Sequence, residues 1–315
     1  MSNGHIRAWG YWSQAKLQIL DDYLRAFLRA SSPIETRIYV DAFAGWGTGR
    51  DRATGEEFAG SARIALEAVA GEHRFTKLLF FESPEPAAEL ERTLRPLYPG
   101  RDFTVHPGDC NEQIPQALTA VVTWAPTFAF LDPDGLELAW TTLVALSDHK
   151  RGYRTSSKPE YKIELWLLFS TQGLVRTLAL DASLLRPADE ARATRLYGNE
   201  QWRAIYQLRV ANQIDASRAK NEYVNLMRWR LSTVLGYRWT HSLELKNLRG
   251  GTVYHMLFAT DNAAGNTIME DLYSRAAAAI PQMRQDAVDR ASGQLSLIPG
   301  GYPEYEPEPP WEPPG

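Results

Sequence analysis

The chain contains very little cysteine. Among its 315 residues only Cys110 carries a thiol. A single thiol can form neither an intrachain disulfide framework nor a zinc site built on cysteines, so both are excluded. The six histidines are scattered and never occur as a closely spaced pair such as H-x-x-x-H. We therefore expect no bound metal ion.

Long apolar runs are also missing. No stretch approaches the roughly 20 apolar residues that a membrane-spanning helix needs, so we expect no membrane association. The first residues, MSNGHIRAWGYWSQAK, have no apolar core and no cleavage site, so we expect no signal peptide and a cytoplasmic protein. Hydrophobic residues still make up 44% of the chain, enough for the core of one large domain or of one domain with a substantial insertion.

An excess of positive charge is absent as well. The formal net charge is -4, and the four glutamates of residues 302–315, a stretch without basic residues, account for all of it. The rest of the chain is neutral, which argues against strong nonspecific binding of nucleic acid but not against a local basic groove. Because this tail is rich in proline and glutamate, residues 294–315 are expected to be disordered.

Apolar runs that alternate with helical patterns fill the first half of the chain. Residues 11–30 have apolar side chains at helical spacing and are expected to form an amphipathic helix. Between residues 36 and 170, five short and almost wholly apolar runs are each followed by a helical pattern or a polar loop. Strands of this kind indicate a parallel sheet that is covered by helices on both faces.

The pattern changes after the fifth strand. Residues 171–236 have only helical or irregular patterns, and two further strands follow, joined by a Gly-Gly turn that indicates an antiparallel hairpin. The expected fold is therefore an α/β fold with a doubly wound, Rossmann-like sheet. It would comprise residues 1–170 and 237–290, with a helical insertion at 171–236 and the hairpin at its C-terminal end.

Acidic residues follow four of the five expected parallel strands. They are Asp41, Glu82, Asp109 and Asp132. Because the carboxyl ends of parallel strands meet at one edge of a sheet, where ligands bind, these acids are expected to line that edge. Each alone could be the N-cap of a helix. Four together indicate a ligand rich in hydroxyl and amino groups.

The glycines that follow Asp41 have the spacing G-x-G-x-G, and about a dozen residues of expected loop separate them from a helix whose N-cap would be Ser61. A dinucleotide site needs G-x-G-x-x-G at the start of a helix, and a P-loop needs a lysine that is missing here. The acid before the glycines would repel a phosphate and attract a cation. These features favour S-adenosylmethionine, bound by Asp41, Phe43, Gly45 and Gly47, over NAD.

Further contacts with the donor follow from the strand ends. Glu82 is placed to accept hydrogen bonds from both ribose hydroxyls, and Asp109, with its neighbour Cys110, is placed at the adenine amino group. Lys16, in the first helix, is expected to reach the donor's carboxylate or the substrate. The alternative for Lys16 is a solvated helix lysine.

The sequence FLDPDG, at the end of the fourth strand, is expected to lie beside the methyl donor. Asp132 would accept a hydrogen bond or a proton from the methyl acceptor, and Pro133 would fix the turn of this catalytic motif. Enzymes that methylate amino groups of DNA have a second proline and a base-stacking aromatic here, which Asp134 and Gly135 replace. A stacking ring would have to come from Trp140 or Trp46.

Substrate binding is expected at Asp134, Trp140, Arg50 and Arg154. Arg50 lies in the expected loop after the glycines, and Arg154 lies in the most basic segment, residues 149–162. Long loops are often functional, and a basic segment with interleaved tyrosines could bind a nucleic-acid backbone. Mobile, solvated side chains are the alternative for both arginines.

Taken together, VDAFAGWG, FFES, GDCN and FLDPDG resemble the motifs of class I methyltransferases. More closely, WSQAKLQILDDYL, the delayed GSARIALE, LDPDGLELAW and VYHMLFATDNAAGNTIM resemble the three-Cys-motif partner (TcmP) family. The resemblance covers about residues 12–269. It implies a methyltransferase-like fold and a partner protein with three cysteines that resembles radical-SAM proteins.

The sequence therefore predicts an S-adenosylmethionine-dependent methyltransferase, with nucleic acid as the first candidate for its substrate. The alternative is an accessory subunit that docks the three-Cys partner and has a regulatory or degenerate donor site. The sequence indicates no oligomeric state.

Overall fold

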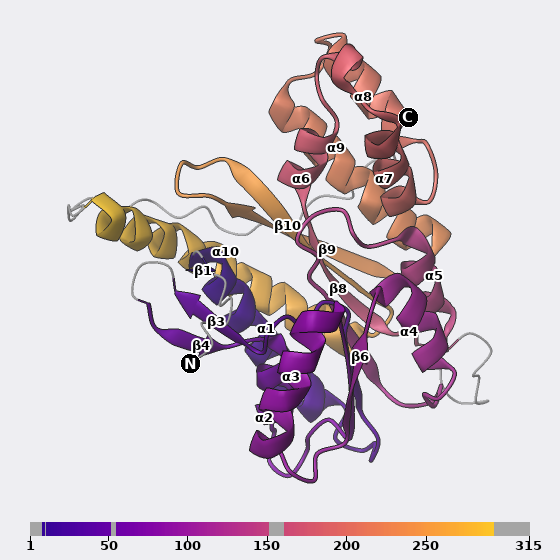
Figure 1. Ribbon diagram of the computed structural model, residues 1–315, viewed down its shortest axis with the longest axis vertical. Coiled ribbons are helices and arrows are strands. Elements are labelled where there is room, and N and C mark those ends of the chain that lie inside the picture. The colour runs from indigo at the N-terminus through magenta and orange to yellow at the C-terminus, as the bar shows by residue number, and fades with distance from the viewer. Residues whose placement is uncertain (1–7, 10, 52–54, 151–160, 293–315) are drawn as a thin grey trace.

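The computed structural model describes residues 8–292, apart from residues 10, 52–54 and 151–160. Within these residues, the centre of the molecule is a seven-stranded sheet in the order β6-β5-β2-β7-β8-β10-β9 (Figure 1). Its strands are β2 (Ile38–Asp41), β5 (Lys77–Glu82), β6 (Phe103–Pro107), β7 (Thr127–Leu131), β8 (Glu164–Phe169), β9 (Trp239–Lys246) and β10 (Thr252–Thr260). The first five are parallel, whereas β10 is antiparallel to both β8 and β9. The expected α/β fold with a mostly parallel sheet is confirmed.

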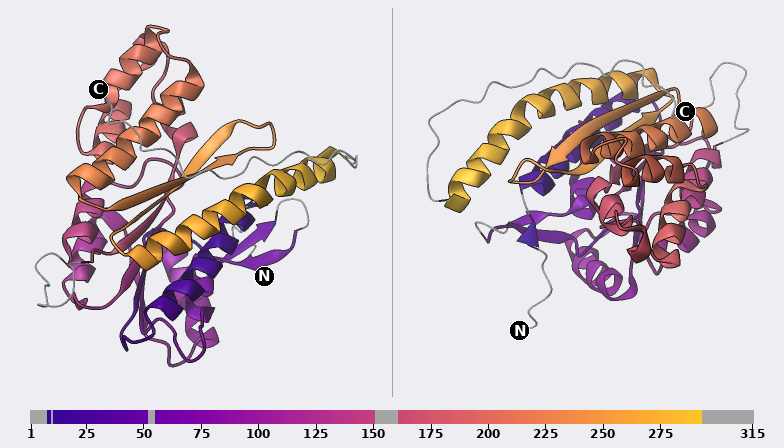
Figure 2. Two further views of the ribbon diagram at one scale, coloured as in Figure 1. Left: turned by 180° about the vertical axis from the view of Figure 1, so that it is seen from behind. Right: turned by 90° about the horizontal axis from the view of Figure 1, so that it is seen from above.

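Helices cover both faces of the sheet, because side chains along each buried strand alternate between two cores. In β2, Ile38 and Val40 belong to one core and Tyr39 to the other. The first core is shared with α4 (Cys110–Leu118) and α5 (Trp140–Asp148). The second is shared with α1 (Tyr11–Ala30), α2 (Ser61–Glu67), α3 (Pro84–Leu97) and α10 (Ala263–Ser292). In Figure 2, α10 lies along α1.

The segment between β8 and β9 is helical, as expected, and forms the upper part of Figure 1. It contains α6 (Thr171–Thr177), α7 (Pro187–Tyr197), α8 (Trp202–Val210), α9 (Ala216–Trp229), the 3-10 turn η1 (Ala182–Leu184) and the π-helical turn η2 (Arg230–Val234). Its apolar side chains, such as Tyr197 and Trp202, extend the core of the α4–α5 face. The division of the chain into domains stays a prediction, and residues 294–315 lie outside the described part.

The loop that was expected between the glycines and α2 is instead partly a β-structure. After the glycines, β3 (Thr48–Asp51) and β4 (Glu57–Ala59) form an antiparallel pair, and β1 (Ala8–Trp9) runs parallel to β3. Gly49 lies opposite Phe58, and a Cβ added there would lie 2.4 Å from the Phe58 ring. The ring thus covers a strand with almost no apolar side chains, which is why its sequence pattern did not predict a strand.

Gly47 packs the glycine loop closely against α3. Its φ is +76°, a Cβ there would lie 2.8 Å from Leu90 Cδ1, and its carbonyl accepts a hydrogen bond from Gly60 N at 3.0 Å. A donor contact for Gly47 was expected, but the residue is buried against α3.

Replacing Gly47 by alanine is expected to lower the free energy of unfolding by about 2–4 kcal/mol, from the left-handed backbone and from overpacking at Leu90. Gly71→Ala is the matched control, because φ there is +63° but no atom lies within 4 Å of the added Cβ. The control should cost only about 1–2 kcal/mol. Urea unfolding of the two variants measures the difference, and equal losses would show that the contact with Leu90 is unimportant.

No helix of the described residues is both long and apolar enough to cross a membrane.

Candidate functional site

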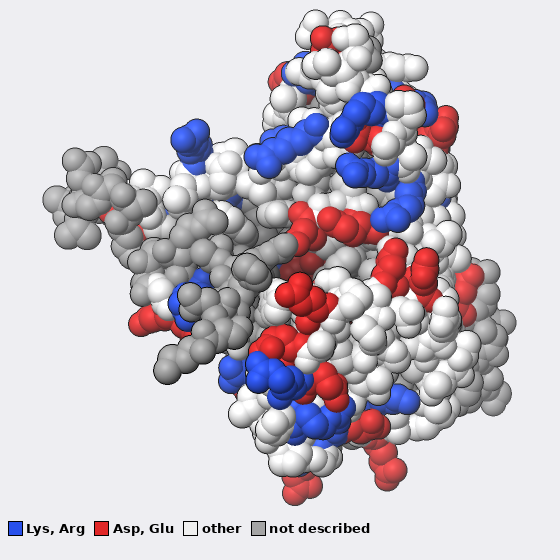
Figure 3. Space-filling model, in the orientation of Figure 1, with Lys and Arg blue, Asp and Glu red and all other residues white. Residues whose placement is uncertain are grey.

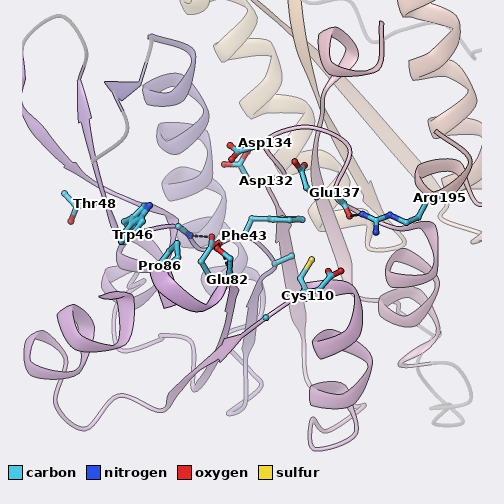
Figure 4. A pocket seen from close by; sticks show the side chains of 15 residues that line it. Phe43, Trp46, Thr48, Glu82, Pro86, Cys110, Asp132, Asp134, Glu137 and Arg195 are labelled. Atoms are coloured by element: carbon cyan, nitrogen blue, oxygen red, sulfur yellow. Dashed lines mark hydrogen bonds between the residues drawn. The ribbon is translucent and has the colours of Figure 1, made fainter. Parts of the chain in front are cut away.

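A cavity of about 560 Å³ opens at the carboxyl ends of β2, β5, β6 and β7 (Figure 4). The chain leaves β2 toward β5 on one side, while β7 pairs with β2 on the other. The strand order therefore reverses at β2, which is where open α/β sheets bind ligands. The lining residues are Ala42, Phe43, Gly45, Trp46, Thr48, Glu82, Ser83, Pro86, Gly108, Asp109, Cys110, Asp132, Asp134, Glu137 and Arg195.

Glu82 and the glycine loop form one wall of the cavity. Glu82 Oε2 accepts a hydrogen bond from Gly45 N at 2.8 Å, and Oε1 accepts from Ser83 N at 2.7 Å and Ser83 Oγ at 2.9 Å. Gly45 donates from a left-handed conformation with φ +62°, which favours glycine. Since an ionised carboxylate accepts about four hydrogen bonds, Glu82 is held in place and can still accept from a ligand.

Asp109 and Asn111 shape the neighbouring wall. Asp109 is the N-cap of α4, and its Oδ1 accepts from Asn111 N at 2.9 Å and Asn111 Nδ2 at 2.7 Å. The Asn111 amide also donates to the Glu137 carbonyl at 2.9 Å and accepts from Ala139 N at 2.7 Å. Asn111 thus fixes the loop between β7 and α5 beside Asp109. Sequence reasoning missed this role of Asn111, since only its place after Cys110 marks it.

Cys110 lies next to Asp109 and is buried at the first residue of α4. Burial, together with the negative charges of Asp109 and Glu82, raises the pKa of the Cys110 thiol to about 12. The thiol is therefore neutral, and it offers the cavity a small apolar surface rather than a nucleophile.

Asp132 forms a shielded ion pair with Lys16 of α1. Lys16 Nζ donates to Asp132 Oδ2, and the two side chains are 4% and 11% exposed. The same ammonium lies 5.9 Å from the centre of the Phe130 ring. Lys16 does not line the cavity, so the expected contact with a donor carboxylate is replaced by this pair, which spans 116 residues of sequence. A neighbouring ammonium stabilises the negative charge of a carboxylate.

Asp41 lies beneath the cavity instead of in its wall. It is fully buried and accepts from Tyr39 Oη at 3.1 Å, from Phe43 N at 3.3 Å and from the Ser61 hydroxyl. Asp41 therefore does not line the cavity, because its oxygens support the loop and the start of α2, and its expected contact with the donor stays a prediction. Ser61 is also not the N-cap of α2, since that position belongs to Gly60 and the Ser61 hydroxyl serves Asp41.

The stability of the protein is expected to depend on Asp41 between pH 4 and pH 7. Burial raises the pKa of Asp41 from 3.8 to about 7. The hydrogen bond from Ser61 opposes this shift, and the negative charge of Asp132 adds to it. When the pKa of an acid is higher in the folded protein than in the unfolded chain, its protonated form stabilises the fold at low pH. This stabilisation is complete below the pKa of the unfolded chain and is lost as the pH rises through the pKa of the folded protein.

Asp41→Asn should therefore gain stability relative to the unmodified chain by about 1.4 kcal/mol per pH unit between pH 4 and pH 7, with no further change above. Denaturant unfolding at several pH values measures this difference. A difference that does not depend on pH would contradict the assignment.

Three other expected site residues lie outside the cavity wall. Trp140 is 6% exposed and packs against Gly198 and the Arg230 guanidinium, which lies 4.2 Å from its ring centre. It is a core residue between α5 and the insertion and does not line the cavity, and its expected role in substrate stacking stays a prediction. Pro133 is buried behind the turn and does not line the cavity, so it shapes the backbone only. Arg50 pairs with Glu57 at 2.8 Å, away from the lining.

The cavity does contain Asp134 and Trp46, as expected, and Arg195, which the sequence did not indicate (Figure 4). Arg195 reaches in from α7 and donates to the Glu137 carbonyl at 2.6 Å. A basic residue on an insertion helix carries no sequence signal of its own. Arg154 lies outside the described residues.

The cavity has a strongly acidic lining. Of its described residues, Glu82, Asp109, Asp132, Asp134 and Glu137 are acidic, and Arg195 is basic. In Figure 3, acidic side chains gather in the hollow between the sheet and the insertion, with basic side chains above and below. Such a lining favours a cation and disfavours a pyrophosphate. In the described part of the chain, no group of three or more His, Cys, Asp or Glu side chains is arranged to hold a metal ion.

Comparison with known proteins finds no matching family model and no matching curated protein. Among solved structures, the chain is similar to protein LPL1258 from Legionella pneumophila, whose title names the family model DUF519. The TM-score is 0.47 and the identity 11%, over 83% of this chain and 91% of the other. A likeness at this level says nothing about activity. The resemblance to the TcmP family stays a prediction.

Proposed function

We propose that the protein is an S-adenosylmethionine-dependent methyltransferase. The observation that carries this proposal is one cavity at the reversal point of the sheet, in which Gly45, Glu82, Asp109 and Asp132 converge from four strand ends. The doubly wound sheet with its antiparallel hairpin and helical segment agrees with the expected class I arrangement. The finer assignment to a methyltransferase depends on the chemistry of the cavity.

The residues of the cavity suit a cationic nucleoside. Glu82 Oε2 can accept one further hydrogen bond, from a ribose hydroxyl, and Asp109, at the N-terminus of α4, can accept from an adenine amino group. Phe43 and Cys110 supply apolar surface between them. Dinucleotides fit poorly, because five carboxylates would surround a pyrophosphate with a single arginine to oppose them.

When bound, S-adenosylmethionine supplies a methyl group on positively charged sulfur. Asp132 then has the role of orienting the acceptor: its carboxylate accepts a hydrogen bond from an amine or hydroxyl and takes up the proton that leaves. Lys16 holds this carboxylate in one position by the ion pair. Because methyl transfer is an in-line displacement, such positioning supplies much of the catalysis.

Nucleic acid is the acceptor class that we propose. Trp46 lines the cavity and offers a ring on which a base can stack. The acidic lining requires that only the base enters, with the phosphates outside it, where Figure 3 shows basic side chains on the insertion. We also propose a cytoplasmic location and a three-Cys partner protein, as the sequence predicts.

Calorimetry is expected to show binding of S-adenosylmethionine and S-adenosylhomocysteine, and none of NAD at the same concentrations. The acidic cavity accounts for this order, since it attracts the sulfonium and repels the pyrophosphate. Incubation of the protein with labelled donor and total RNA or DNA then tests the acceptor. The proposal fails if neither sulfur ligand binds.

A further inference from the structure

A second cavity, of about 210 Å³, lies at the opposite edge of the sheet from the acidic one. It is bounded by Thr127 and Glu164, the first residues of the parallel strands β7 and β8, by the end of α1 and by the start of α10. The acidic cavity lies at the other ends of the same strands. The two cavities therefore lie at opposite ends of these strands.

The walls of this second cavity are mainly apolar and aromatic. Phe27 and Ile34 come from α1 and the loop after it, and Ile268 comes from α10. Trp124 and Tyr161 are 43% and 40% exposed, so they stand at the mouth. An apolar cavity with a few polar groups is the usual form of a small-molecule site.

Three of the described residues that line this apolar cavity are charged. Lys162 is paired with Asp261 at 2.8 Å, and the other two, of opposite sign, are buried. Glu164 is 5% exposed and Lys150 is 7% exposed. Glu164 Oε2 accepts from Tyr23 Oη at 2.5 Å, and Oε1 accepts from Thr260 Oγ1 at 2.9 Å. A Cβ added to Gly265 would lie 2.4 Å from Glu164 Oε1, so the backbone of α10 covers this carboxylate.

Lys150 has fewer polar partners than Glu164. Among the described residues, its Nζ has no hydrogen bond or ion pair within 4 Å, and its charge interacts with Glu164 only at longer range. Burial, opposed by the charge of Glu164, lowers the pKa of Lys150 to about 8. An ammonium on a largely buried side chain is stabilised by an acceptor, and the described residues provide none to Lys150.

We propose that this second cavity binds a small apolar carboxylic acid, with its carboxylate on Lys150 and its hydrocarbon part against Phe27, Ile34 and Trp124. A cationic ligand would need Glu164, whose oxygens already accept from two hydroxyls and are covered by α10. The cavity is smaller than the roughly 300–1,000 Å³ of drug-sized sites, so the ligand is about a phenyl ring with a short chain.

The test uses three probes that differ only in their head group: 3-phenylpropionate, 3-phenylpropionamide and 3-phenylpropylamine. Calorimetry and tryptophan fluorescence, to which Trp124 contributes, follow the binding. The acid is expected to bind at least about tenfold more tightly than the amide, and the amine to bind more weakly still, because an ammonium–carboxylate bond is the stronger one.

Two variants and the pH dependence of binding then test whether the ligand's carboxylate lies at Lys150. Lys150→Met should weaken binding of the acid at least about tenfold, whereas Lys77→Met, at the first residue of β5 and outside the cavity, should leave it unchanged. With the unmodified chain, affinity should be constant between about pH 6 and pH 8, where the ligand is ionised, and fall above pH 8, as Lys150 loses its proton. Among the described residues, the titratable groups that line the cavity or surround Lys150 are Glu164, Tyr23, Tyr161, Lys162, His149 and Asp261.

Equal affinity for acid and amide, unchanged binding of the acid to a folded Lys150→Met variant, or no binding of any probe at millimolar concentration would each overturn the proposal. Thermal unfolding shows whether the variant is folded. If it is not, the pH dependence measured on the unmodified chain still decides, since affinity that does not change between pH 7 and pH 10 excludes Lys150.

Discussion

Replacing Asp132 by asparagine is expected to lower the rate of methyl transfer by about 10²- to 10⁴-fold, the usual contribution of a positioned general base. Asparagine keeps the shape of the side chain but cannot take up a proton. The affinity for S-adenosylmethionine should change by only a few-fold, because Glu82 and Asp109 carry the donor contacts. Single-turnover kinetics with labelled donor, together with calorimetry, separate the two effects.

Lys16 provides the control for this variant. Asp132→Asn leaves the buried Lys16 ammonium beside a neutral amide, and breaking a buried ion pair costs about 3–5 kcal/mol of stability. The double variant Lys16→Met/Asp132→Asn removes both charges and should be more stable than Asp132→Asn. If the double variant is well folded and inactive, the loss of activity is chemical and not a consequence of unfolding.

The Lys16→Met variant alone tests whether Lys16 acts through Asp132. It is expected to reduce the rate of methyl transfer and to shift the rising limb of its pH profile upward, because the carboxylate loses a neighbouring positive charge. A lower rate with an unchanged pH profile would assign Lys16 a structural role only. Asp132→Asn with nearly full activity would remove Asp132 from the mechanism, and a protein that binds the donor but never transfers methyl groups would favour the accessory-subunit alternative.

Replacing Glu82 by alanine is expected to weaken binding of the donor by at least about tenfold. A hydrogen bond to an ionised carboxylate contributes about 1.5–3 kcal/mol, and the variant also frees the Gly45 amide that shapes the loop. Glu85→Ala is the matched control, because Glu85 is an exposed acid in the first turn of α3, outside the cavity wall. Its donor affinity should match that of the unmodified chain.

Binding of S-adenosylhomocysteine, the product of the reaction, distinguishes two possible roles of Glu82. If Glu82 binds the ribose, Glu82→Ala should weaken S-adenosylmethionine and S-adenosylhomocysteine equally, because their riboses are identical. If it acts on the sulfonium charge, only S-adenosylmethionine should be weakened. Calorimetry of both ligands decides between them, and unchanged affinity for both would exclude Glu82 from the donor site.

The sequence by itself determined the order of strands and helices and the edge at which polar residues gather. Strands such as β2 and β7 are buried along their whole length and almost wholly apolar, so their position and the acids at their ends can be recognised locally. The left-handed Gly45 and the acid Glu82 could be proposed for the same reason, since each depends on its place at a strand end. The short β3–β4 pair escaped prediction because its apolar contact comes from a single ring, Phe58.

Only the tertiary structure decided which of these side chains reach the cavity. Asp41 and Asp132 both follow central strands, yet one is fully buried under the loop and the other lines the cavity. Lys16 meets Asp132, and Arg195 meets Glu137, across long stretches of sequence. Trp140 is buried by an insertion whose docking the sequence does not specify. Such pairings depend on how distant elements pack together, and a local pattern of residues carries no record of that packing.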